Sequence, residues 1–283
     1  PGFNFDWSKV MTISFVSALF ADALSQMYFA TAVREKEKGN AEQLMEKYLD
    51  QVQDHVYNKD IGSVYRLLKK AVHEFNNIGV SKGVFPRIGI VGEIYVKYNS
   101  FGNHYAVDWL LQQGIEPVVP PLIDFFTQEL VNYHVNRKAN LAKTRFKTDM
   151  YIYFIEYLSN KYIRRVNRIV SNFRFYTPFH NIRHISARAS KILSLANQSG
   201  EGWLIPAEMA TFADSGINNV VSFQPFGCIA NHVISKGIEK RLRDLYPQMN
   251  ILYLDFDDGT SEVNMLNRLH FMVRNVKEGS ASV

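Results

Sequence analysis

Cys228 is the only cysteine among the 283 residues, and it stands where a strand is expected to pass into a helix. The apolar, β-branched run 220–223 predicts a buried strand, Pro225 and Gly227 end it, and a helical pattern begins at about Cys228. The positive end of a helix stabilises a thiolate. Two interpretations follow: Cys228 is a reactive or ligating thiolate, or it is a small buried apolar residue.

Other polar residues are predicted to lie near Cys228. In a parallel sheet the loops that follow the strands meet at one edge, where ligands are usually held. Four such segments are expected, 92–103, 120–121, 224–228 and 255–262, and the turn 197–203 could close over them. The candidate ligand-pocket residues in or next to these segments are Glu93, Lys97, Asn99, Asn103, Glu201, Gln224, Asn231, His232 and Asp255.

Two smaller groups permit more specific chemistry. Cys228 and His232 are four residues apart and share a helix face, a spacing that permits zinc binding or a cysteine–histidine nucleophile pair. A helix histidine bonded to a carbonyl or to water is the more common arrangement. Asp255, Asp257 and Asp258 could bind magnesium, although acidic residues before a helix more often cap it.

Composition limits the class of protein. A hydrophobic content of 47% allows a substantial core, and the net charge of +5 is spread among acidic residues. This pattern excludes a nucleic-acid footprint and allows a small anionic ligand. One cysteine excludes an internal disulfide and a self-contained thiolate cage, and predicts a cytoplasmic protein. The apolar stretch 10–33 contains Asp22 and Gln26, which favours a buried helix over a membrane span.

A long helix expected at 145–171 combines aromatic and basic residues. Its aromatic side chains at helical spacing, such as Tyr153 and Tyr157, are expected to pack rather than to stack on bases. Arg164, Arg165 and Arg168, with Arg174 beyond the helix, predict a solvated face, and anion binding is the less favoured alternative.

The elements that position these residues follow from hydrophobic periodicity. Helices are expected at 7–33, 41–57, 61–77, 103–113, 122–135, 145–171, 180–195, 204–215, 228–246 and from about 262 to 277, and strands at 87–92, 116–119, 220–223 and 250–255. This order predicts an α/β fold, a Rossmann-like parallel sheet of about four strands flanked by helices, with an extensive helical layer. The expected organisation is an N-terminal helical layer (1–80), a βαβ unit (81–140), a helical insertion (141–199) and an αβαβα unit that completes the same sheet (200–283).

Four segments resemble a known family. Residues 87–99, 200–204, 224–232 and 255–268 are similar to the C-terminal part of the large acyl-CoA dehydratase activase-related proteins, also described as CoA-substrate-specific enzyme activases or 2-hydroxyacyl-CoA dehydratase-like proteins. The resemblance covers about residues 8–275, and the Gln-Pro-Phe-Gly-Cys run at 224–228 is its most specific part.

The resemblance implies a function. Such proteins combine an ATP-dependent activator with the iron–sulfur component of 2-hydroxyacyl-CoA dehydratases, on an α/β scaffold whose cysteines hold a 4Fe-4S cluster. Cys228 stands where the family would supply one thiolate. The companion cysteines and an ATP-binding phosphate signature are missing from this sequence, which lacks an initiator Met, so they are expected upstream in a longer parent chain.

Three hypotheses follow. The first is a dehydratase-like C-terminal portion of a CoA enzyme activase, inactive alone, which contributes Cys228 to a metal centre completed upstream and meets an acyl-CoA or similar small anionic ligand, with no nucleic-acid or membrane partner. The second is a non-catalytic scaffold that docks to the N-terminal ATPase portion of the parent chain. The third is a cysteine-dependent acyl transferase or hydrolase built on Cys228 and His232.

Overall fold

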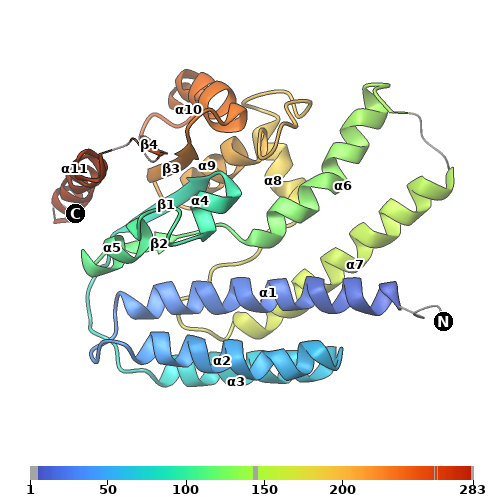
Figure 1. Cartoon of the computed structure of the whole chain (residues 1–283), viewed down its shortest axis with the longest axis horizontal. Coiled ribbons are helices and arrows are strands. Elements are labelled where there is room, and N and C mark those ends of the chain that lie inside the picture. The colour runs from blue at the N-terminus through green and yellow to red at the C-terminus, as the bar shows by residue number, and fades with distance from the viewer. Residues whose placement is uncertain (1–5, 143–145, 258, 260, 282–283) are drawn as a thin grey trace. The chain divides into compact units, whose positions relative to one another are not determined.

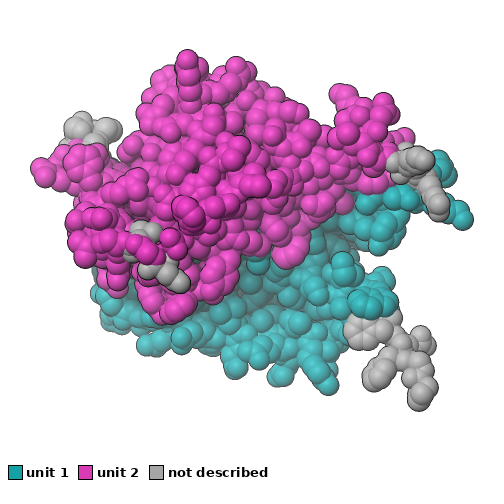
Figure 2. Space-filling view, turned by 45° about the horizontal axis from the view of Figure 1, so that its top comes forward, with its two compact units in different colours: residues 1–82, 121–123, 145–180 teal, residues 83–120, 124–144, 181–283 magenta. Residues whose placement is uncertain are grey.

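The computed structural model describes residues 6–142, 146–257, 259 and 261–281, without the side chains of 279–281. The chain forms two compact units, distinguished by colour in Figure 2. Unit 1 comprises residues 1–82, 121–123 and 145–180, and unit 2 comprises 83–120, 124–144 and 181–283. The division of the sequence into four segments is not tested by these units and stays a prediction.

Unit 1 is helical. It contains α1 (Trp7–Ala32), α2 (Asn40–Tyr57), α3 (Ile61–Asn77) and α7 (Phe146–Val170). The first three helices run side by side in Figure 1, and α7 packs against both α1 and α3. Asp6 and Asp60 cap α1 and α3, because each carboxylate accepts a hydrogen bond from a backbone N–H in the first turn.

Helix α1 is the one described helix that is long and apolar enough to cross a membrane by length and composition. Eleven of its residues are buried in the fold. One of these is Asp22, whose carboxylate accepts hydrogen bonds from the backbone N–H groups of Leu122 and Ile123, at 2.8 and 3.1 Å. Asp22 thereby satisfies two donors at the start of α6 (Leu122–Lys138), which have no partner within that helix.

Unit 2 is built on a parallel sheet. Its strands are β1 (Arg87–Gly92), β2 (Glu116–Val118), β3 (Asn219–Pro225) and β4 (Asn250–Phe256), in the order β2-β1-β3-β4. The remaining helices are α4 (Ile94–Tyr98), α5 (Ala106–Gln112), α8 (Ile182–Ala189), α9 (Leu204–Asp214), the π-helix η1 (Ala230–Ser235), α10 (Glu239–Leu245) and α11 (Glu262–Ala281). The expected α/β fold with a four-stranded parallel sheet and a large helical layer is confirmed.

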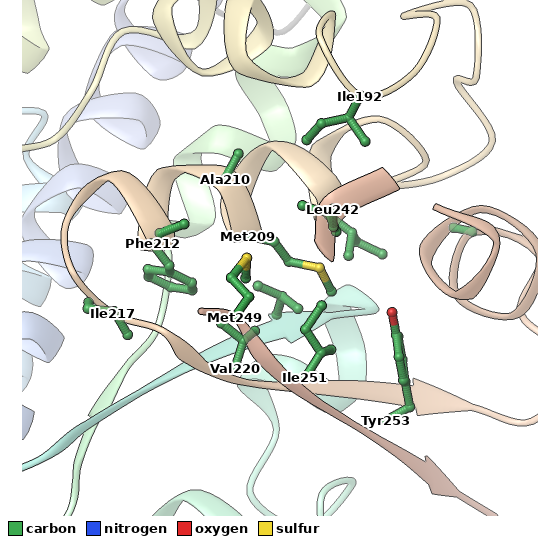
Figure 3. Packing of buried hydrophobic residues seen from close by; sticks show 14 residues of the cluster. Ile192, Met209, Ala210, Phe212, Ile217, Val220, Leu242, Met249, Ile251 and Tyr253 are labelled. Atoms are coloured by element: carbon green, nitrogen blue, oxygen red, sulfur yellow. The ribbon is translucent and has the colours of Figure 1, made fainter. Parts of the chain in front are cut away.

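Helix α9 covers one face of the sheet. Figure 3 shows Met209 and Phe212 directed from α9 toward Val220 and Ile251 of the strands. Gly89 of β1 lies under this helix, and a Cβ atom there would come within 2.4 Å of the Phe212 ring. The glycine in the middle of β1 is therefore needed for the close approach of helix and sheet.

Aromatic contacts tie the edges of the sheet to α5 and α11. Trp109 of α5 meets His270 of α11 edge to face at 4.5 Å, and His104 stacks on Phe256 of β4 at 5.9 Å. Helix α11 packs against β4, and α5 packs against β2 (Figure 1).

Helices α5 and α8 are shorter than the expected 103–113 and 180–195, and two further segments differ in kind from the expected elements. The single helix expected at 228–246 is divided into η1 and α10, with Gly237 between them, and η1 buries the polar residues Asn231 and Ser235. A π-helical turn shifts the register of the helix and is frequent at functional sites. The expected loop after β1 contains α4, because the Glu93 side chain accepts a hydrogen bond from Val96 N–H and caps a short helix.

Candidate functional site

The candidate site lies where the direction of the chain connections reverses. From β1 the chain moves outward to β2, whereas from β3 it moves outward in the opposite direction to β4. In open parallel sheets the crevice at such a point, beyond the carboxyl ends of the strands, is the usual ligand site. Here those ends are Gly92 of β1 and the segment from Phe223 to Pro225 of β3.

Gly92 brings the two strand ends together. It has a φ of 129°, and a Cβ atom on it would lie 1.9 Å from the carbonyl oxygen of Phe223. The next residue, Glu93, donates its backbone N–H to the same oxygen at 3.0 Å. The chain can therefore leave β1 directly beside β3 only because residue 92 has no side chain.

A buried charged cluster stands beside these strand ends. Lys97 Nζ of α4 lies 2.9 Å from Glu208 Oε1 of α9, and both side chains are 2% exposed. Glu201, in the turn before α9, accepts a hydrogen bond from Ile94 N–H at 2.9 Å. Burial raises the pKa of Glu208 to about 7 against the opposing effect of Lys97, and burial also raises the pKa of Glu201.

Four fully buried polar residues accompany this cluster. Ser222 and Gln224 belong to β3, Asn231 and Ser235 belong to η1, and each is 0% exposed. In the part of the chain that the structure describes, no hydrogen-bond partner is found for the two serine hydroxyls, Asn231 Oδ1 or either polar atom of the Gln224 side chain. Buried polar groups are nearly always hydrogen-bonded, so these atoms call for a partner from outside the protein chain.

These residues converge on one face of the sheet. Ser222 and Gln224 are two residues apart on β3, so they point to the same side as their β4 neighbours Tyr253 and Asp255. Tyr253 and Val220 of this face pack in one cluster with α9 and with Ala230 of η1. Because the Tyr253 hydroxyl donates to the Ser235 carbonyl at 3.1 Å, η1 is held over the ends of β3 and β4.

The glycine-rich turn before α9 approaches η1. A Cβ atom on Gly200 would lie 3.8 Å from Cβ of Ala230, and one on Gly202 would lie 2.8 Å from Cδ1 of Ile234. The turn therefore lies against η1, while its Glu201 reaches the start of α4. The turn 197–203 therefore lies near the segment 92–103, which follows β1, as the sequence suggested.

Cys228 and His232 have different partners. Asn231 Nδ2 donates to Cys228 Sγ at 3.2 Å. His232 Nε2 lies 3.5 Å from Asp255 Oδ1, and Lys236 Nζ lies 3.3 Å from His232 Nδ1. Among the described side chains no hydrogen bond joins Cys228 to His232, so the geometry does not support a nucleophile pair.

The side chains present do not form a complete metal site. Among the described residues no group of three or more His, Cys, Asp or Glu could hold a metal ion, and Cys228 is the only cysteine. A 4Fe-4S cluster needs more thiolates than this chain has. For the suggested magnesium group, Asp255 is half-buried beside His232, Asp257 is exposed, and Asp258 lies outside the described residues.

Asn99 and Asn103 shape the loop after α4. The Asn99 side chain accepts from Gly102 N–H at 2.8 Å. Asn103 accepts from Ala106 N–H and donates to the Val96 carbonyl, and α5 begins at Ala106, three residues later than expected. Their described bonds are local to this loop, and neither shares a described bond with the charged cluster.

Sequence reasoning missed several residues of the site. Glu208, Ser222 and Ser235 were not among the candidates. Glu208 interrupts the apolar pattern of 204–214, and Ser222 interrupts the apolar run 220–223. A polar residue at a position that should face the core was the available signal. Lys236 was also missed, although it is four residues after His232 and the expected helix already places the two side chains on one face. No protein-family model, curated protein or solved structure matches this chain.

Proposed function

We propose that unit 2 binds a small ligand rich in hydrogen-bonding groups between the ends of β1 and β3, as expected for the dehydratase-like portion of a CoA enzyme activase. The observation that carries this proposal is the set of buried polar atoms without partners on Ser222, Gln224, Asn231 and Ser235. Each such group costs about 1–3 kcal/mol if nothing satisfies it. A ligand that supplies the missing bonds is the simplest compensation.

The chemistry of these groups indicates which part of a ligand they would hold. Amides and hydroxyls are neutral and can both donate and accept. The nearby Lys97 ammonium group already has Glu208 as its partner at 2.9 Å, so it is not free to bind a ligand. A 2-hydroxyacyl thioester offers a carbonyl acceptor and a hydroxyl donor and acceptor close together. We therefore assign this pocket to the acyl end of such a ligand.

We further propose that Cys228 supplies one thiolate to a metal centre completed by other parts of a longer parent chain. The hydrogen bond from Asn231 Nδ2 supports this role, because a donor at 3.2 Å fixes the orientation of the Cys228 sulfur atom. Cys228 precedes η1 and follows β3, so it would hold the metal at the edge where the ligand binds.

The proposed ligand site is tested by thermal unfolding of the 283-residue chain with and without 2-hydroxybutyryl-CoA. We expect the thioester to raise the midpoint for the wild type, and free CoA to raise it less. Gln224→Leu should abolish the difference between the two ligands. Gln112→Leu, an exposed residue of α5, is the matched control and should preserve it. Equal responses of the wild type to both ligands would refute recognition of the acyl end.

A docking scaffold is the second candidate, and exposed apolar residues on α7 favour it. Phe146, Met150, Tyr151, Phe154 and Tyr157 are each more than half exposed. The expectation that the aromatic side chains of this helix pack is therefore wrong for Tyr157, and also for Tyr153. Patches of this kind often mark interaction surfaces. Binding of a separately produced ATPase portion that is abolished by Phe154→Glu and unaffected by Cys228→Ala would support the scaffold.

A further inference from the structure

Basic side chains gather in one groove of unit 1, between α3 and α7. The groove has a volume of about 990 Å³, and its cationic lining consists of Arg66, Lys69, Lys161, Arg164, Arg165 and Arg168. His73 adds a seventh basic group, and none of the described lining residues is acidic. On α3 the basic residues are three or four positions apart, and on α7 Lys161 and Arg165, like Arg164 and Arg168, are four apart, so each set occupies one face.

Most of these charges are not neutralised within the protein. The side chains of Lys69, Lys161, Arg164 and Arg168 form no ion pair or hydrogen bond with the residues that the structure describes. The Arg66 guanidinium donates a hydrogen bond to the Ser63 hydroxyl at 2.6 Å and lies 3.9 Å from the Asp60 carboxylate.

The spacing of the basic residues on α7 lowers the stability of that helix. Lys161 and Arg165, and likewise Arg164 and Arg168, are like charges four residues apart, which repel each other on a helix. A bound anion would remove this repulsion.

We propose that this groove binds a chain of linked phosphates, as found in nucleoside polyphosphates and in inorganic polyphosphate. A single phosphate can engage only some of six cations spread over two helices, whereas a phosphate chain can contact both helices. Arginine suits this task because its planar fork binds phosphate oxygens in pairs. The volume lies at the upper end of the range for small-ligand sites, about 300–1,000 Å³.

The lining argues against nucleic acid as the occupant. Single strands are held on exposed aromatic rings that stack on bases. Tyr65 is the one Phe, Tyr or Trp of the described lining; it is 3% exposed, and the Arg165 guanidinium lies 4.1 Å from its ring centroid. Tyr65 therefore orients Arg165 and offers no surface for a base. The described lining therefore lacks the row of exposed aromatic rings on which a single-stranded nucleic acid stacks.

The test is isothermal titration of the full chain with tripolyphosphate and with ATP, without divalent metal and at low salt. We expect both to bind and to weaken as salt is raised. Equal affinities would assign recognition to the phosphate chain alone, and tighter binding of ATP would add a contact to the nucleoside; both outcomes support the proposal. Absence of tripolyphosphate binding at millimolar concentration would overturn it.

Two matched double variants test whether phosphate binding depends on the charges of the groove or on the net positive charge of the protein. Lys69→Gln/Arg164→Gln removes one charge from each helix inside the groove, and Lys70→Gln/Lys147→Gln removes one from each helix outside it. The first pair should weaken tripolyphosphate binding by roughly tenfold or more, and the second by less than about twofold. Equal weakening, or tighter binding of a single-stranded RNA than of tripolyphosphate to the wild type, would refute the proposal. All four side chains are exposed, and unchanged unfolding midpoints would show that both variants fold.

Discussion

Lys97 Nζ and Glu208 Oε1 are 2.9 Å apart, and both side chains are almost completely buried although the residues are 111 positions apart in the sequence. The pair joins α4, at the end of β1, to α9, which covers the sheet. Because it stands beside the unpartnered polar residues of β3 and η1, it fixes the walls of the proposed ligand site. Its energetics can be measured independently of any ligand.

Removing one partner of this pair should cost more stability than removing both. At a pH well above 7, where the Glu208 carboxyl is ionised, Lys97→Met leaves this carboxylate buried without its cation, and we expect a loss of about 3–5 kcal/mol. The double variant Lys97→Met/Glu208→Leu leaves no buried charge and should recover most of that loss. Urea unfolding followed by tryptophan fluorescence measures the cycle. Additive losses in the double variant would show that the two side chains are not coupled.

The stability of unit 2 should depend on pH through Glu208. Its pKa is raised by burial from 4.5 to about 7, so the folded state binds this proton more tightly than the unfolded state. The resulting stabilisation is complete below pH 4.5 and is lost as the pH rises toward 7. Glu208→Gln should therefore flatten the fall in unfolding free energy over that interval. Glu42→Gln, at an exposed position, should leave the slope unchanged.

Gln224→Leu should stabilise the ligand-free protein. Both polar atoms of Gln224 are buried without a partner, and leucine has a similar volume without polar atoms. We expect a gain of roughly 1–2 kcal/mol in the free energy of unfolding. A residue that lowers stability in this way is typical of a binding site. A loss of stability would instead show that Gln224 serves packing in the folded protein.

The fold was predictable because its signals are local. The apolar runs 87–92 and 250–255 and the helical periods of α1 to α3 each report burial within a few residues, and the structure has these elements within about one residue of the expected bounds. The break between η1 and α10 was not predicted. The hydrophobic pattern continues through it, and its one local signal is Gly237, which does not by itself show that a helix ends.

The candidate site was only partly predictable for a similar reason. Glu93, Glu201 and Gln224 follow or end strands and turns, so their position at the sheet edge follows from topology. Glu208 lies in a helix interior, and its role depends on a lysine 111 residues away. The basic groove shows the same limit, since its residues come from segments 66–73 and 161–168 and appear dispersed along the chain. The sequence around a residue does not indicate which distant segment that residue contacts.

Gly92→Ala should weaken the pairing of β1 with β3. We expect it to lower the free energy of unfolding by more than a glycine-to-alanine substitution at an open position with positive φ. Its φ of 129° is strained for alanine, and the new methyl group would overlap the Phe223 carbonyl, 1.9 Å away. Gly216→Ala is the matched control, because Gly216 also has a positive φ, 74°, but has nothing within 4 Å of the new Cβ. We expect the control to lose about 1 kcal/mol, the cost of the backbone conformation. Gly92→Ala should lose several times more, since the strands must separate to admit the methyl group. Equal losses in urea unfolding would show that the strand ends are not held as closely as the hydrogen bond from Glu93 N–H to Phe223 indicates.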